Sequence, residues 1–313
     1  MPEPLLDSLW RGILDAADPV RIRFAIKGLF LLMLVLCIFV FIGAKLASDL
    51  GRDVVSAVGL VFTFIANGVF VLGLAHLTAR GRSRNAEATP LAAAFSNFSA
   101  AAGTPTLFAA AVALLLLVES VFFSLGRVGS LGEVLVSLAF MPVVLLNAGL
   151  LLASGIGVWL GAAVAARRGI GAVKSFKAAV ALIRRNPRIV FPVYVAAFFL
   201  TGLLLYVVWM AMAFPVSLTL WTAQQAMPGY RLVLITGLPQ FTMGAFGPFG
   251  AALTALASGA GVSSQLANLI FLCMALLVAA AAAAYPTVLL SEISMRICDA
   301  GGGSREEHSA ATA

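Results

Sequence analysis

The stretch FAIKGLFLLMLVLCIFVFIGAKLA, residues 24–47, decides the fold class of this chain. It is longer than the roughly 20 apolar residues that a helix needs to cross the hydrocarbon core of a bilayer. Its charged residues, Lys27 and Lys45, stand near the two ends, where long side chains reach the lipid headgroups. No small-residue cleavage site follows the run, so we predict a retained membrane-spanning helix and no signal peptide.

The composition of the whole chain points to lipid as its main solvent. Of the 313 residues, 62% are hydrophobic and only 11% are charged, whereas a soluble domain has about a quarter charged residues. The formal net charge is +7, which in a soluble protein would suggest nucleic acid. Here the basic residues flank apolar runs, as they do at the cytoplasmic ends of membrane helices, so we expect no nucleic-acid partner.

Five further apolar runs resemble the first. We predict an all-α, polytopic bundle of six membrane-spanning helices within a single transmembrane domain over residues 24–295. The predicted spans are residues 24–47, 54–77, 106–125, 134–165, 189–214 and 266–293.

The two ends of the chain are predicted to lie outside the spans. Residues 1–23 have apolar residues at helical spacing, which is typical of an amphipathic helix on the cytoplasmic membrane surface that ends near Asp18 and Pro19. A frayed tail is the alternative for this segment. We expect residues 296–313 to be a disordered cytoplasmic tail.

The segment at residues 232–260 is apolar but broken by Gly and Pro over residues 237–250. Irregular backbone at membrane depth needs protein or a water-filled cavity to satisfy its polar groups. We therefore predict an external or re-entrant segment. The alternative is a seventh span, which would place the C-terminus outside.

The distribution of positive charge predicts the orientation. With six spans, four of the twenty Lys and Arg residues lie outside, and the other sixteen lie on the cytoplasmic side. The external four are Lys45, Arg52, Arg127 and Arg231. Positive charge collects in cytoplasmic loops, so we expect both termini in the cytoplasm and a multi-pass protein of the bacterial inner membrane.

Two stretches that precede spans three and five are similar to each other. When residues 89–105 are aligned with residues 171–187, Pro105 falls on Pro187. Each copy reads as an amphipathic helix, a polar turn with Pro, and then a span, because Pro ends one helix and can open the next. We predict an internal duplication of this unit, with each short helix along the inner membrane surface. Chance similarity between Ala-rich stretches is the alternative.

The second copy, SFKAAVALIRRNP at residues 175–187, resembles a motif in a loose group of bacterial six-span membrane proteins. These are similar to the membrane domain that precedes some glycerophosphodiester phosphodiesterases. The resemblance covers mainly residues 170–205 and more faintly 88–120. It implies a six-helix bundle and no activity, because no soluble phosphodiesterase domain is present to carry catalytic residues.

An ionisable group inside a membrane suggests a functional site, because burying its charge in lipid is costly. We identify Glu119 as the only acidic residue well inside a span, and we consider it as a proton or cation site. Asn67 and Asn147, together with Asn268, are predicted to contact it or to line a polar path. The alternative is that the carboxyl reaches the interface and that the amides only join helices.

Two further sets of residues are predicted to bind helices or lipid. Small residues recur every four positions in span four, which lets another helix approach closely; they are Ala153, Gly157, Gly161 and Ala165. Basic residues near the cytoplasmic ends are predicted to contact anionic lipid headgroups. These are Arg80, Arg82, Arg84, Arg167, Arg168, Lys174, Lys177, Arg184 and Arg185.

The sequence contains no catalytic or metal-binding motif that we recognise. The three cysteines and two histidines have no spacing typical of a metal site, and no phosphate loop or nucleophile elbow is present. We expect no cofactor and no metal, and we do not expect an enzyme. Two functions remain. One is a non-catalytic scaffold, assembly partner or membrane-organising component, with a membrane protein or a second copy as its partner. The other is a transporter or channel that uses Glu119 and residues 237–250.

Overall fold

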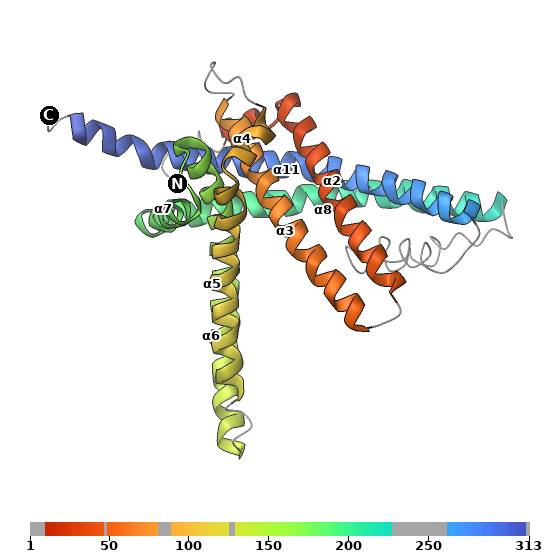
Figure 1. Ribbon diagram of the computed structural model, residues 1–313, viewed down its shortest axis with the longest axis horizontal. Helices are drawn as coiled ribbons and strands as arrows, with labels where there is room; N and C mark the ends of the chain where they lie inside the picture. Colours follow the sequence, from red (N-terminus) through yellow and green to blue (C-terminus); the bar gives the residue numbers. More distant parts are fainter. Residues whose placement is uncertain (1–9, 47–48, 81–88, 125–128, 227–261, 311–313) are drawn as a thin grey trace. The chain divides into compact units, whose positions relative to one another are not determined.

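The structure is a computed structural model that describes residues 10–46, 49–80, 89–124, 129–226 and 262–310, and these residues form helices and no strand (Figure 1). Six helices are long and apolar, as the sequence predicts. They are α2 (Pro19–Lys45), α3 (Asp49–Arg80), α5 (Phe98–Ser124), α6 (Gly129–Arg168), α8 (Pro187–Ala226) and α11 (Val262–Ala310). Two short helices, α4 (Pro90–Ser96) and α7 (Ala172–Arg185), precede α5 and α8.

Each long helix contains a segment apolar and long enough to cross a membrane, which confirms the predicted class of a multi-pass membrane protein. The spanning segments are Pro19–Phe39, Asp53–Arg80, Phe98–Ser124, Ser137–Arg168, Pro187–Val208 and Leu272–Ala300. Large apolar side chains on them stay exposed, for example Leu117 at 62% and Phe199 at 73%. Such surfaces are stable in contact with lipid. The broken segment at 232–260 lies outside the described residues.

The first span begins earlier than predicted, at Pro19 instead of residue 24. The Asp18 side chain accepts a hydrogen bond from the Val20 backbone N–H at 2.9 Å, and its carboxylate pairs with Arg21 at 3.2 Å. Asp is a preferred residue before the first turn of a helix, and Pro is well suited to its first position. The predicted helix break at Asp18 and Pro19 is therefore present, since residues 10–15 are helical and the chain turns before α2.

The chain divides into two compact units. The first comprises Met1–Asp15, Gly68–Val195 and Leu289–Ala313, and the second comprises Ala16–Asn67 and Ala196–Val288. In the second unit, Cys37 of α2 packs with Leu272 and Leu276 of α11, and further apolar residues of α2, both aromatic and aliphatic, pack against them. Phe39 of α2 also lies 5.8 Å from Phe62 of α3, measured between ring centroids.

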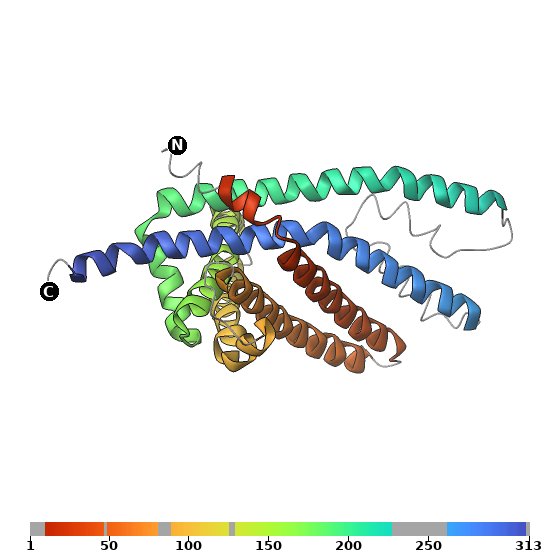
Figure 2. The same cartoon turned by 90° about the horizontal axis from the view of Figure 1, so that it is seen from above.

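The C-terminal helix is longer than predicted. α11 is one continuous helix that passes through Pro286 and continues to Ala310 (Figure 2). Residues 296–310, for which the sequence predicted a disordered tail, are helical in the structure. The first residues of this segment have tertiary contacts, because Arg296 and Asp299 form ion pairs and Cys298 is buried. These contacts stabilise the continuation of α11 beyond the predicted end of the span.

Two helix–corner–helix units are present, but not in the register of the predicted duplication, which stays a prediction. Pro105 lies inside α5 and makes no turn. The first corner is instead at Asn97, with φ −112° and ψ 44°, and the second is at Asn186, with φ −128° and ψ 50°. The carbonyl of each Asn accepts hydrogen bonds from the first turn of the next helix. Asn favours such positions because its short polar side chain competes with regular helix bonding.

Pro105 has a different role inside α5. Proline has no N–H, so it cannot donate to the carbonyl of Ala101 four residues earlier. Gly68 of α3 stands directly against that carbonyl oxygen, and a Cβ at this position would clash with it. A Cα–H group can make a weak hydrogen bond to such an oxygen. The glycine therefore lets α3 come close to α5 within the first unit.

Candidate functional site

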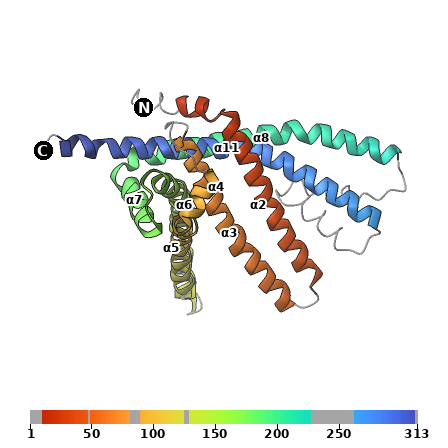
Figure 3. The same cartoon turned by 45° about the horizontal axis from the view of Figure 1, so that its top comes forward.

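The apolar face of α7 packs against α5 and α6 (Figure 3). The rings of Phe176 on α7 and Phe108 on α5 lie 4.6 Å apart between centroids. Ser175 and Ala179 of α7 are completely buried, and Ala179 lies next to Gly161 of α6. We predicted that this helix lies along the inner membrane surface. In the structure the apolar side of α7 contacts α5 and α6.

The turn that leads into α7 is fixed by polar contacts. Gly169 ends α6 with a left-handed φ of 61°, a conformation that glycine adopts without steric cost. The carbonyl of Ile170 then accepts two hydrogen bonds, from the Asn97 amide at 3.2 Å and from the Ser175 hydroxyl at 3.1 Å. Asn97 is also the corner between α4 and α5. The corner and the turn are therefore tied together, and they hold α7 in place.

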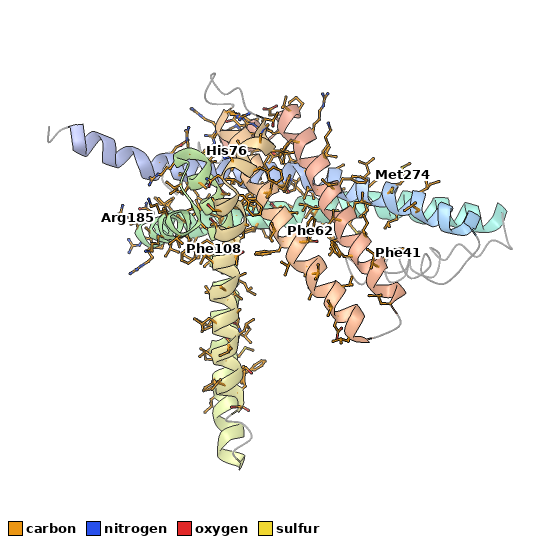
Figure 4. All side chains as sticks on the ribbon, in the orientation of Figure 1. Phe41, Phe62, His76, Phe108, Arg185 and Met274 are labelled. Carbon is orange, nitrogen blue, oxygen red and sulfur yellow. The ribbon has the colours of Figure 1, made fainter. Side chains whose placement is uncertain are left out.

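The opposite face of α7 is basic and exposed. It carries four of the predicted headgroup residues, Lys174, Lys177, Arg184 and Arg185. None of these four forms an ion pair in the part of the chain that the structure describes. In Figure 4, Arg185 lies on the far side of α7 from Phe108. We call these four residues the basic face.

The other predicted headgroup residues have different environments. Arg80 is in the last turn of α3 and is half-buried, and Arg168 is exposed at the end of α6. Arg167 forms an ion pair with Asp299 of α11, at 2.8 Å. Arg82 and Arg84 lie outside the described residues. Arg167 is thus partly neutralised by the protein itself, whereas the basic face is not.

The small-residue stripe of α6 packs within the chain. A Cβ at Gly157 would clash with the ring of Phe108, and a Cβ at Gly161 would clash with Thr104, both on α5. Ala165 is buried and Ala153 is half-buried. Two members of the stripe therefore allow α5 to approach α6 closely, as small residues do between membrane helices.

The structure brings Glu119 and Asn147 together. The Asn147 side-chain amide donates a hydrogen bond to Oε2 of Glu119 at 2.8 Å, so the pair joins α5 to α6. The Glu119 side chain is only 8% exposed, and its other oxygen, Oε1, has no hydrogen-bond partner. Asn67 belongs to the other unit, and nothing relates it to this pair. The role of Glu119 as a functional site stays a prediction.

A second set of buried polar residues, which the sequence analysis missed, ties α11 to its neighbours in the first unit. The hydroxyls of Thr78 on α3 and Ser291 on α11 lie 3.0 Å apart. The Tyr194 hydroxyl of α8 lies 2.5 Å from that of Ser294, which also donates to the carbonyl of Leu290. Buried polar groups are stable when they satisfy one another in this way.

The same part of α11 contains a second buried acid. Glu292 has 0% exposure, and its Oε2 lies 3.9 Å from Nε of Arg296, which also pairs with Asp15. The prediction that Glu119 is the only acidic residue well inside a span is wrong, since the last span runs to Ala300. An acid and a base four residues apart share one helix face. That spacing was the available signal for Glu292.

Among the residues that the structure describes, no group of three His, Cys, Asp or Glu side chains is placed to hold a metal ion. No known protein family matches the chain, and no similar protein was found among curated proteins or among solved structures. The resemblance to the membrane domain of some glycerophosphodiester phosphodiesterases therefore stays a prediction.

Proposed function

We propose that this multi-pass membrane protein is a non-catalytic scaffold, assembly partner or membrane-organising component, with the basic face of α7 as its contact surface. The observation that favours this function is that α5 and α6 hold α7 in place. Its apolar side is held by α5 and α6, so the helix face that carries the four cations keeps a fixed direction. A preorganised surface loses less entropy on binding than a flexible one. Anionic lipid headgroups are the ligand that we propose, because each nearby Lys or Arg favours them.

The proposed orientation has both termini in the cytoplasm of a bacterium, with the protein in its inner membrane. Two ion pairs support a common side for the two ends of the chain. Asp15 pairs with Arg296, and Arg167 at the end of α6 pairs with Asp299. The helix ends joined by these two pairs carry basic residues, and basic residues favour the cytoplasmic side. A reporter fused after Ala313 tests this: we expect activity from the cytoplasm only, and activity from outside would contradict it.

The lipid contact can be measured with spin-labelled lipids in reconstituted vesicles. We expect the wild-type protein to retain phosphatidylglycerol in preference to phosphatidylcholine at its surface. A variant with Gln at all four positions of the basic face should lose much of that preference. Each cation near the surface contributes up to about 1 kcal/mol, which is roughly fivefold in affinity. High salt should weaken the wild-type preference, since it screens exposed charges.

A charge-conserving variant is the matched control. Exchanging each Lys for Arg and each Arg for Lys on the basic face keeps four positive charges but alters every side chain. We expect it to keep the preference for phosphatidylglycerol. An unchanged preference in the folded Gln variant would show that the basic face is not the lipid contact.

A transporter or channel is the second candidate, and the environment of Glu119 favours it. Its Oε1 has no partner although the side chain is nearly buried, as in a site that exchanges a solute. Glu119→Gln should then abolish flux of that solute into vesicles while the fold is kept. A scaffold should be unaffected by the same substitution. The broken segment at 237–250 lies outside the described residues and adds no support.

A further inference from the structure

Near the C-terminal end of α5, the carboxyl group of Glu119 uses only one of its two oxygens. Oε2 accepts the hydrogen bond from the Asn147 amide at 2.8 Å, while Oε1 has no partner. The side chain is 8% exposed. A buried polar atom without a partner costs about 1–3 kcal/mol, and more when it is charged. The native state therefore gains if something binds at Oε1.

An open cavity of about 590 Å³ lies beside this carboxyl group. The described residues that line it come from one face of α5: Leu116, Glu119, Ser120, Phe123 and Ser124. One water molecule occupies about 30 Å³ in the liquid. The cavity is therefore large enough for an ion to enter with part of its water shell.

The polar atoms around this cavity are mainly oxygen acceptors. The Ser124 hydroxyl donates to the carbonyl of Val121 at 2.6 Å, which leaves its lone pairs available. Asn147 is not a lining residue, but it bonds Glu119 through its nitrogen, so its Oδ1 is not used in that bond. Ser120 adds a further hydroxyl on the same helix face. Carboxylate, carbonyl and hydroxyl oxygens are the ligands that hard cations prefer.

The charge of the site indicates which cation it would hold. Glu119 forms no ion pair with a Lys or Arg in the described part of the chain. A single carboxylate is neutralised by a monovalent ion, whereas a divalent ion would leave a net positive charge at a nearly buried site. Uncompensated charge inside a membrane protein is strongly unfavourable.

We propose that Glu119, with Asn147 and the hydroxyls of Ser120 and Ser124, binds a monovalent alkali cation. This site goes beyond the scaffold function and does not depend on it, because the basic face belongs to another helix. It requires binding only and not transport across the membrane.

Equilibrium binding of radioactive Na⁺, and separately of Rb⁺, to the full chain in lipid nanodiscs tests the proposal. We expect wild-type protein to bind one ion per chain and Glu119→Gln to lose at least tenfold in affinity. Gln keeps the oxygen that accepts the bond from Asn147, so the fold should persist. Ser120→Ala should weaken binding by a smaller factor.

Thr106→Val is the matched control, since Thr106 is an exposed hydroxyl on α5 that bonds only the carbonyl of Ala102 in its own helix. This variant should bind the ion as wild type does. The proposal is overturned if neither ion binds to wild type above background. It is also overturned if wild type and Glu119→Gln bind an ion equally well, because the ion would then bind elsewhere.

Protection from a carbodiimide gives a second and independent measurement. Dicyclohexylcarbodiimide modifies carboxyl groups in apolar surroundings, and a cation bound at the carboxyl group blocks the reaction. We expect Na⁺ or Rb⁺, but not choline at the same ionic strength, to reduce modification of the peptide that contains Glu119. Modification that is insensitive to both ions would contradict the site. The lipid preference of the basic face should be unchanged in Glu119→Gln, so the two proposals can fail separately.

Discussion

Glu292 and Glu119 are both buried carboxyl groups of the first unit, but their surroundings differ. Glu292 is completely buried and lies 3.9 Å from Arg296, beside two pairs of bonded hydroxyls. Glu119 contacts a neutral amide and faces a cavity. A carboxylate that is paired with a cation of the protein itself contributes to the stability of the fold. A charge without one can be balanced from outside, so its removal should affect binding more than stability.

The largest effect should follow from Arg296→Met, which removes the cation next to Glu292. Removing one partner of a buried ion pair is strongly destabilising and costs about 3–5 kcal/mol. We expect the free energy of unfolding in mixed detergent micelles to fall by roughly this amount. The exposed pair with Asp15 contributes little of it, because surface ion pairs are worth about 1 kcal/mol or less.

The double variant Arg296→Met with Glu292→Gln sharpens this test. Removing both charges avoids leaving a buried carboxylate without the cation of Arg296, so the double variant should be more stable than Arg296→Met alone. If the two losses simply add, then the charges are not coupled and the contrast with Glu119 fails.

A smaller effect is expected from Tyr194→Phe, which removes one hydroxyl from the set around α11. Tyr194 is fully buried and bonded to Ser294, so we expect a loss of about 1–2 kcal/mol in unfolding free energy. Tyr206→Phe on the same helix is the control, because Tyr206 is 59% exposed. It should change stability by less than about 0.5 kcal/mol. Equal losses in the two variants would show that the Tyr194 hydroxyl is not part of a stabilising set.

The six spans were predictable because a run of about 20 apolar residues has few alternatives to crossing a bilayer. The corner at Asn97 was not, because Pro105 drew the predicted turn eight residues too far along the chain. Proline is tolerated inside a membrane helix when a neighbour satisfies the freed carbonyl. Gly68 of α3 stands there, and only the tertiary structure reveals this contact.

The candidate site was predictable in part. Glu119 stands out in an apolar run, and an amide in the next span is an obvious partner. The free Oε1 and the cavity depend on how α5 and α6 pack, which the sequence does not encode locally. Glu292 was missed because the predicted span ended at residue 293, so this acid counted as lying at the end of a span, where acids are common. Its complete burial results from Arg296 and from the neighbouring helices.

The smallest effects on stability are expected at Glu119 itself. Asn147→Leu removes the amide that bonds Glu119, and hydrogen bonds between membrane helices average about 0.6 kcal/mol with a maximum near 1.7. Glu119→Gln keeps an acceptor for that bond, so its unfolding free energy should stay within about 0.5 kcal/mol of wild type. The same variant is expected to lose the cation. A large loss of stability in Glu119→Gln, measured as for Arg296→Met, would mean that the two carboxyl groups do not differ, and that Glu119 is held by the fold as Glu292 is.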